Sequence, residues 1–225
     1  MTDPQGKAKT AKNLKQELRK QRIKEGTGDY GAHSKHPEKL NEALFLSLSG
    51  TVESAHVRGH EQLACSYEFI MGPDWRLQQS RPVAACDSQY SNNLPSRSGA
   101  TSVWNFPIEA TFTSTNVSGW PRLVMTLFDK NLLARGYGSL LIPPYEGTYT
   151  RYVRMFVPKA SSPMQDFLGW LINAPPEFRE GKFIAQNNDR EVTRTESEGV
   201  LKVILHVATK NMGKYGYTQK SAIGN

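Results

Sequence analysis

Hydrophobic and polar positions alternate along several short stretches of this chain with the two-residue period of a β-strand. Leu44, Leu46 and Leu48 share one face of the first such stretch, and Gly50 follows them. Both faces of residues 123–128 are apolar, which predicts a central strand of a sheet. The other predicted strands are residues 63–71, 108–113, 139–142, 148–157 and 199–209.

Glycine and proline clusters separate these stretches and predict turns, because glycine tolerates positive φ and proline fixes φ near −65°. The clusters are Trp-Asn-Phe-Pro-Ile at 104–108, Gly-Trp-Pro at 119–121, Gly-Tyr-Gly at 136–138 and the run 143–149. Strands in quick succession, with turns between them, predict an all-β fold. We expect an antiparallel β-sandwich of about seven to nine strands.

One short helix is expected near residues 163–172. Ser162 is a suitable N-cap, Pro163 suits the first helical position, and Gln165 completes a capping box. The apolar positions with helical spacing are Met164, Phe167, Leu168 and Leu171. We expect this helix to cover one end or edge of the sheet.

The chain divides into three parts by composition. Residues 1–40 form a basic tail that we expect to be disordered, residues 41–212 form the folded domain, and residues 213–225 form a polar C-terminal tail. Within the domain, residues 72–100 are rich in Ser, Asn, Pro and Arg and are expected to be a long connection. Trp75 lies in it, either as an exposed anchor for a partner or lipid surface or folded back onto the core.

Charge is concentrated in the N-terminal tail. The whole chain has a net charge of +7, and residues 1–39 hold ten Lys or Arg against five acids, so +5 of it lies there. A tail of this kind can contact anionic lipid or an acidic protein surface. The folded part lacks a basic stripe interleaved with aromatics, so nucleic acid is not an expected partner. The tail residues proposed for partner or lipid contact are Lys12, Lys15, Arg19, Lys20 and Arg22.

Neither a membrane span nor a secretory leader is expected. No apolar run approaches the roughly 20 residues of a membrane-spanning helix, and the start of the chain lacks the apolar region of a signal peptide. These features predict a cytosolic protein. A disulfide between Cys65 and Cys86 is accordingly disfavoured.

The sequence contains no catalytic or cofactor-binding constellation, such as a phosphate loop, HExxH, CxxC or Gly-x-Ser-x-Gly. Cys65 falls on an apolar strand face, which favours a buried structural thiol over a nucleophile. His56 and His60 lie near it, and one weaker alternative makes these three residues zinc ligands without an evident fourth. The other weaker alternative is hydrolase activity around Cys65 and His60. His206 lies in a strand and is expected to be a satisfied or surface imidazole. No enzyme activity, metal or cofactor is expected.

Several ordered motifs resemble the B9-domain family from about Leu44 to Tyr217. They are Gly-Thr-Val-Glu-Ser-Ala (50–55), Trp-Asn-Phe-Pro-Ile (104–108), Ser-Thr-Asn-x-x-Gly-Trp-Pro (114–121), Arg-Gly-Tyr-Gly (135–138), Met-Phe-Val-Pro (155–158), Arg-Glu-Val-Thr-Arg (190–194) and Val-Ala-Thr-Lys-Asn-Met (207–212). The motif residues expected to be structural are Trp104, Phe106, Pro107, Gly119, Trp120, Pro121, Gly136, Tyr137, Gly138, Gly147 and Pro158.

The resemblance implies a C2-like β-sandwich without catalytic activity. It implies a scaffold at the ciliary basal body and transition zone, assembling with other B9-domain proteins and membrane proteins in the Meckel-syndrome (tectonic-like) complex. That complex supports ciliogenesis and the ciliary membrane diffusion barrier. The basic residues 1–39 depart from the family pattern, so nothing is carried over to them. The alternative is a calcium-independent peripheral membrane module that uses the basic tail and sandwich loops.

Overall fold

A computed structural model describes residues 43–60, 62–80, 92–96, 99–159, 184–185 and 195–216 of the chain. Several sequence predictions therefore lie outside the described residues. These are the N-terminal tail with Lys12, Lys15, Arg19, Lys20 and Arg22, the helix at 163–172, Cys86 with its disulfide, and residues 217–225.

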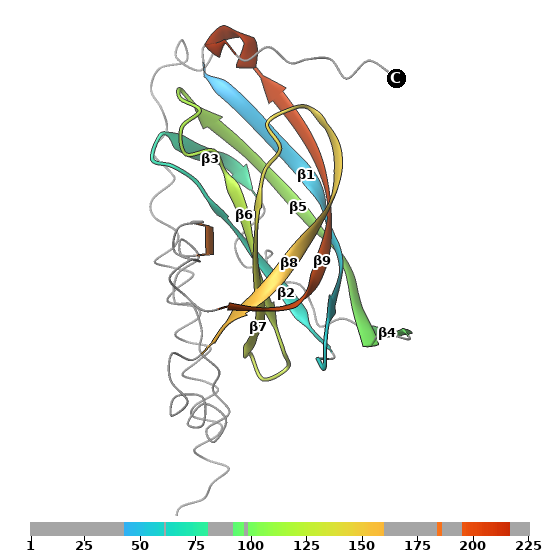
Figure 1. Ribbon diagram of the computed structural model, residues 1–225. Coiled ribbons are helices and arrows are strands. Elements are labelled where there is room, and N and C mark those ends of the chain that lie inside the picture. The colour runs from blue at the N-terminus through green and yellow to red at the C-terminus, as the bar shows by residue number, and fades with distance from the viewer. Residues whose placement is uncertain are drawn as a thin grey trace, which may run out of the picture. The chain divides into compact units, whose positions relative to one another are not determined.

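Nine antiparallel strands form the described structure, with one short 3₁₀ helix after them (Figure 1). The strands are β1 (Leu44–Val57), β2 (Ala64–Ile70), β3 (Trp75–Ser80), β4 (Asn92–Ser96), β5 (Gly99–Ser114), β6 (Arg122–Phe128), β7 (Ala134–Leu141), β8 (Gly147–Pro158) and β9 (Thr195–Lys210); the helix is η2 (Met212–Tyr215). Their order in the sheet is β2-β6-β7-β8-β9-β1-β5-β3, and β4 pairs with β5. The prediction of an all-β, C2-like sandwich is confirmed.

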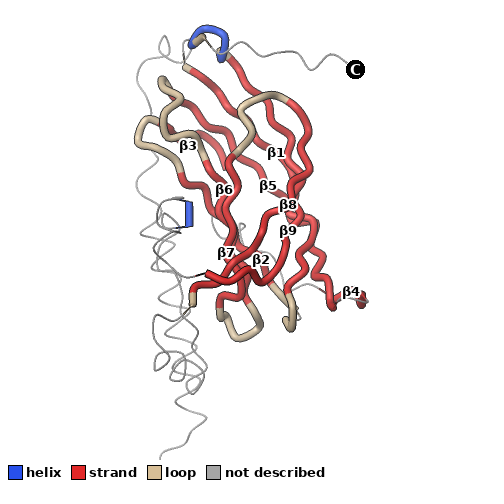
Figure 2. Tube along the Cα trace, viewed as in Figure 1, coloured by secondary structure: helices blue, strands red, loops and turns tan. Residues whose placement is uncertain are grey.

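The sheet bends between β7 and β8, and this bend makes the sandwich. Only one residue pair, Tyr137 with Phe156, joins these two strands, whereas β8 and β9 pair along their length. β2, β6 and β7 form one layer, and β8, β9, β1, β5 and β3 form the other (Figure 2).

The main core fills the space between the two layers. In β1, Leu44, Leu46 and Leu48 are buried while Ser47 and Ser49 are exposed, as the alternation predicts. The inward side chains of β9 follow the same period, with Leu201, Val203, Leu205 and Val207 buried. Burying one such aliphatic side chain contributes about 1.5–3 kcal/mol. The alternating pattern therefore sets which face of each strand turns inward.

A second apolar cluster lies on the outer face of the β2–β6–β7 layer. Leu123, Met125 and Leu127 of β6 face the main core, while Val124 packs with Tyr137, Phe156, Ala134, Ile184 and Ala185. β6 also pairs with β2 on one side and β7 on the other. The prediction of a central strand with two apolar faces is confirmed. Ile184 and Ala185, which precede β9, cover part of that outer face.

Two of the predicted turns are wrong. Gly-Tyr-Gly at 136–138 lies within β7, and Trp-Asn-Phe-Pro-Ile at 104–108 lies within β5. Gly50 likewise does not end its strand, because β1 continues to Val57 and Gly50 pairs with Ile108 and Leu205. The Gly119-Trp120-Pro121 turn is confirmed, and Gly119 has φ of 69° there. The glycines at 50, 136 and 138 do not mark turns, because glycine also occurs where two segments approach closely.

The predicted long connection at 72–100 is also wrong, because β3 and β4 both lie in it. β3 is mostly polar and sits at the end of the sheet, where it pairs only with β5. An edge strand has less apolar surface to bury than a central one, so its alternation is weak. Backbone pairing with β5 specifies these strands more than their hydrophobic pattern does.

Candidate functional site

Three tryptophans tie neighbouring segments together through their indole N–H groups. Trp104 donates to the Leu63 carbonyl at 2.9 Å, Trp75 to the Ser118 carbonyl at 2.9 Å, and Trp120 to the Ile142 carbonyl at 2.8 Å. A buried hydrogen bond of this kind contributes about 0.5–1.5 kcal/mol. Each bond also fixes the orientation of a large ring. These motif tryptophans hold connections of the sandwich in place.

The Trp104–Pro107 motif forms a bulge that links the two layers. The register between β1 and β5 shifts between Val52 and Ser54, opposite Trp104 and Asn105. Asn105 has φ of 49°, a left-handed conformation that asparagine tolerates better than most residues. Beyond the bulge, the Tyr67 hydroxyl of β2 donates to the Pro107 carbonyl at 3.2 Å. The Phe106 ring, partly buried on the core, lies 5.6 Å from the Tyr67 ring.

At the opposite end of the strands, two connections interlock around a pair of glycines. Gly72 N–H donates to the Gly119 carbonyl at 2.8 Å, and a Cβ on Gly119 would lie 2.5 Å from the Gly72 Cα. Trp75 and Trp120 meet edge to face beside them, with ring centroids 4.9 Å apart. Trp75 is only 4% exposed. Of its two alternatives, folding back onto the core is the one that the structure shows.

Polar side chains stabilise the same interlock. The Ser114 hydroxyl donates to the Asp74 carbonyl at 3.0 Å, and Ser118 N–H donates to Asn116 Oδ1 at 3.0 Å. Pro121, which is buried, contributes its carbonyl to Ile142 N–H at 3.3 Å. The Ser-Thr-Asn-x-x-Gly-Trp-Pro motif is therefore a folded connection whose groups are used internally.

The glycines of the Arg-Gly-Tyr-Gly motif lie close to side chains of β8, in the other layer. A Cβ on Gly138 would lie 2.7 Å from Met155 Sδ and 2.9 Å from a Val153 methyl, and a Cβ on Gly136 would lie 3.2 Å from Met155 Cβ. Tyr137, between them, points the other way into the second cluster. Neither glycine is among the residues with positive φ. These glycines leave room for the β8 side chains, which is their physical role.

The remaining motif residues mark the two ends of β8. Gly147 opens the strand with φ of 146°, a conformation that disfavours a side chain. Tyr149, two residues on, donates its hydroxyl to the Tyr145 carbonyl at 2.9 Å. Pro158 ends the strand opposite Thr195. β8 thus begins and ends at motif residues.

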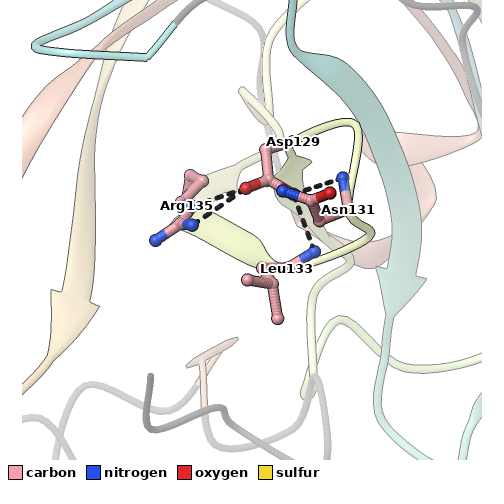
Figure 3. A network of polar contacts seen from close by, with 4 residues as sticks. All are labelled: Asp129, Asn131, Leu133 and Arg135. Carbon is pink, nitrogen blue, oxygen red and sulfur yellow. Dashed lines mark hydrogen bonds and ion pairs between the residues drawn. The ribbon is translucent and has the colours of Figure 1, made fainter. Parts of the chain in front are cut away.

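A charged network closes the β6–β7 turn (Figure 3). Asp129 Oδ1 accepts from Asn131 N–H at 2.8 Å and from Leu133 N–H at 3.1 Å, while Oδ2 accepts from Arg135 Nε at 3.0 Å and Nη2 at 2.9 Å. Burial alone would raise the pKa of Asp129, but these hydrogen bonds and the Arg135 charge together lower it. The network shapes the turn, so Arg135 also has a structural role in the Arg-Gly-Tyr-Gly motif.

The metal and nucleophile alternatives find no support. Among the residues that the structure describes, no three His, Cys, Asp or Glu side chains gather to hold a metal ion, so His56, His60 and Cys65 form no such group. Cys65 is buried in the main core, out of reach of a substrate. The pKa of His60 is lowered, mainly by burial and then by the charge of Arg135. The carboxylates of Glu198 and Asp129 act in the opposite direction but are outweighed.

His206 is an exposed imidazole on β9 with a hydrogen-bonding partner. Its Nδ1 lies 2.9 Å from the Thr148 hydroxyl of β8. The expectation of a satisfied surface histidine is confirmed.

The outer face of the β8–β9–β1 layer carries exposed side chains in the described part of the chain. We call it the open face; its outward side chains are Thr148, Thr150, Tyr152 and Arg154 of β8, Val200, Lys202, Ile204 and His206 of β9, and Ser47, Ser49, Thr51 and Glu53 of β1. Tyr152 is 68% exposed and Val200 is 40% exposed. Tyr152 and Arg154 lie on the same side of β8, away from Arg151, as strand alternation requires. The sequence pattern carried no signal that this side would be exposed.

The fold defines the class of protein as a C2-like β-sandwich, and comparison with known proteins defines the family. The family model for B9-C2, described as "Ciliary basal body-associated, B9 protein", matches residues 46–208. This chain belongs to the B9-C2 family. No solved structure gave a significant match to it. Among the described residues, no helix is long and apolar enough to cross a membrane.

Individual relatives agree with the family. The chain is 38% identical over 185 residues to B9 domain-containing protein 1 of Xenopus laevis, covering 80% of this chain and 91% of that protein. It is 37% identical over 181 residues to B9 domain-containing protein 1 of Homo sapiens, covering 77% of this chain and 86% of that protein. B9 domain-containing protein 2 of Danio rerio is 23% identical over 176 residues, 76% of this chain and 97% of that protein. The resemblance inferred from the motifs is confirmed.

Proposed function

We propose that this protein is a non-enzymatic structural component of the ciliary transition zone. It assembles with other B9-domain proteins, and with membrane proteins, in the Meckel-syndrome (tectonic-like) complex. In that complex it supports ciliogenesis and the diffusion barrier of the ciliary membrane. Its place in the cell is the cytoplasmic side of the cilium base, at the basal body and transition zone.

One observation carries this proposal: the family match runs through the entire sandwich, from β1 to β9. The ciliary basal body is named in the family description itself. The polar groups of the motifs are used for internal hydrogen bonds, which fits a scaffold better than an enzyme. The limits of the folded domain, residues 41–212, and the assignment of a tail on each side of it also remain predictions.

Localisation and affinity capture in ciliated cells test the proposal. The full chain, tagged, is expected to concentrate at the ciliary base and to bring down the other B9-domain proteins. A uniform cytosolic or nuclear signal, with none of the other B9-domain proteins captured, contradicts the proposal. Loss of the protein is expected to reduce ciliation and to let membrane proteins leak between cilium and cell membrane.

A second candidate is calcium-independent binding to a membrane surface. The net charge of +5 in residues 1–39 favours it, because each Lys or Arg near an anionic membrane contributes about 1 kcal/mol. Flotation with vesicles of phosphatidylcholine and phosphatidylserine, with EDTA present, measures it directly. Binding that needs residues 1–39 and weakens with salt supports this candidate. Flotation that is equal with and without these residues rejects the tail as the membrane contact.

A further inference from the structure

The two outer faces of the sandwich differ in how they are covered. On the β2–β6–β7 layer, Val124 and Tyr137 are buried against Ile184 and Ala185 of the same chain. On the open face, Tyr152 and Val200 are two of the four large hydrophobic side chains that stand exposed in the described residues. Within the part of the chain that the structure describes, one outer face is therefore covered and apolar side chains stand exposed on the other.

The exposed side chains of the open face form one compact patch. Tyr152 pairs across the strands with Lys202, and Arg154 pairs with Val200. Directly opposite residues in an antiparallel pair have Cβ atoms about 4.5–5.5 Å apart, and diagonal neighbours are about 7–8 Å apart. We call these four residues the Tyr152 patch. Tyrosine and arginine are among the residue types that most often carry binding energy at protein interfaces.

The charges of the patch point to an acidic partner. The Lys202 ammonium is 2.7 Å from the Glu53 carboxylate, so these two charges cancel. Arg154 has no ion pair or hydrogen bond with any described residue, while Arg151, on the opposite side of β8, lies 5.2 Å over the Tyr149 ring. The patch keeps one uncompensated positive charge beside an exposed aromatic ring.

This charge argues against the two other occupants. Two copies of this chain that met through the patch would place one uncompensated arginine close to another, which is unfavourable. A lipid surface is usually held by clusters of four to eight basic residues, and the neighbours of the patch on the open face are mainly hydroxyl side chains. A protein surface with a carboxylate and an apolar area fits better.

The strands that carry the patch are tied together by side-chain contacts on the same face. The Lys202–Glu53 ion pair joins β9 to β1, and the contact between Thr148 and His206 joins β8 to β9 on the same face. Because Lys202 and the strands beneath the patch are already held in place, binding would cost less conformational entropy at these positions.

We propose that the Tyr152 patch is the docking surface for another B9-type sandwich of a different chain. The partner places a carboxylate opposite Arg154 and apolar side chains over Tyr152 and Val200. This inference rests on the proposed function, since it takes the partner class from it, and adds the surface and its chemistry.

Affinity capture of the full chain from ciliated cells tests the docking surface. The double variant Tyr152→Ala, Arg154→Glu is expected to capture the other B9-domain proteins at least about tenfold less than the unchanged chain, as loss of two interface anchors predicts. Arg154→Lys keeps the charge and is expected to retain most of the capture. The matched controls are Tyr145→Ala, whose ring is 55% exposed outside the patch, and Lys130→Glu, an exposed charge reversal.

The outcomes separate the inference from the proposed function. If the unchanged chain captures no B9-domain protein, the proposed function fails. If it captures them and the double variant captures them equally, with melting unchanged for both, only the docking surface is overturned. Mutual capture of two differently tagged copies that is lost in the double variant, or vesicle flotation that is lost with unchanged capture, would also overturn the assigned partner.

Discussion

Gly138 of β7 faces Met155 of β8 so closely that a Cβ at this position would lie 2.7 Å from the Met155 sulfur. The nearest Val153 methyl would be 2.9 Å away. Real Cβ atoms do not approach other atoms this closely, so a side chain at position 138 would force Met155 and Val153 to move. The Gly-Tyr-Gly motif lies beside the bend of the sheet, where only Tyr137 and Phe156 pair between β7 and β8.

Gly138→Ala is expected to destabilise the sandwich, although alanine is a small residue. The added methyl overfills a packed core, and such changes cost about 1–3 kcal/mol. Gly138→Val is expected to abolish soluble folding. Thermal melting of purified protein measures both, with Leu141→Ala, at an exposed position of the same strand, as the control. Unchanged melting of Gly138→Ala would show that the layers have more room than the structure indicates.

Trp104→Phe is expected to lower the free energy of unfolding by about 1–3 kcal/mol, because the buried Leu63 carbonyl loses its indole donor. The aromatic bulk at the motif is largely kept. Urea denaturation measures the effect as a lower midpoint with an unchanged slope. A midpoint equal to that of the unchanged chain would mean that water replaces the indole at no cost.

Asn105 provides a matched pair of substitutions that isolates backbone conformation from packing. Asn105→Gly is expected to be neutral or slightly stabilising, because glycine adopts positive φ freely. Asn105→Val is expected to destabilise by about 1–3 kcal/mol, since a β-branched residue is strained at φ of 49°. The side chain is exposed, so lost packing does not explain the difference. Equal urea midpoints for the two variants would contradict the left-handed bulge.

Asp129→Asn is expected to lose stability at pH 7 but to match the unchanged chain in acid. The folded-state pKa of Asp129 is lowered, because hydrogen bonds and Arg135 outweigh the effect of burial. The carboxylate therefore stabilises the fold above its unfolded pKa of about 3.9, and this contribution is lost as the pH falls through the lowered folded value. Urea midpoints at pH 7, 5 and 3 measure the convergence. A gap that stays constant across this range would exclude the charge as its source.

The sequence by itself determined the class of fold and the family. Strict alternation in β1 and β9 reflects burial of one strand face, which is a local property of each strand. The two apolar faces of β6 predicted its central place for the same reason. The ordered Trp, Gly and Pro motifs identified the family without revealing what each residue does.

Only the tertiary structure decided the roles of those motif residues. Gly136 and Gly138 serve a contact with Met155, which lies in another strand, so no local rule separates them from turn glycines. Trp75 is buried because Trp120 and the Ser118 carbonyl lie beside it, and both come from a distant connection. The exposure of Tyr152 depends likewise on which outer face the chain itself covers. Contacts between segments far apart in sequence decide these features, because alternation reports which face of a strand is buried and not what buries it.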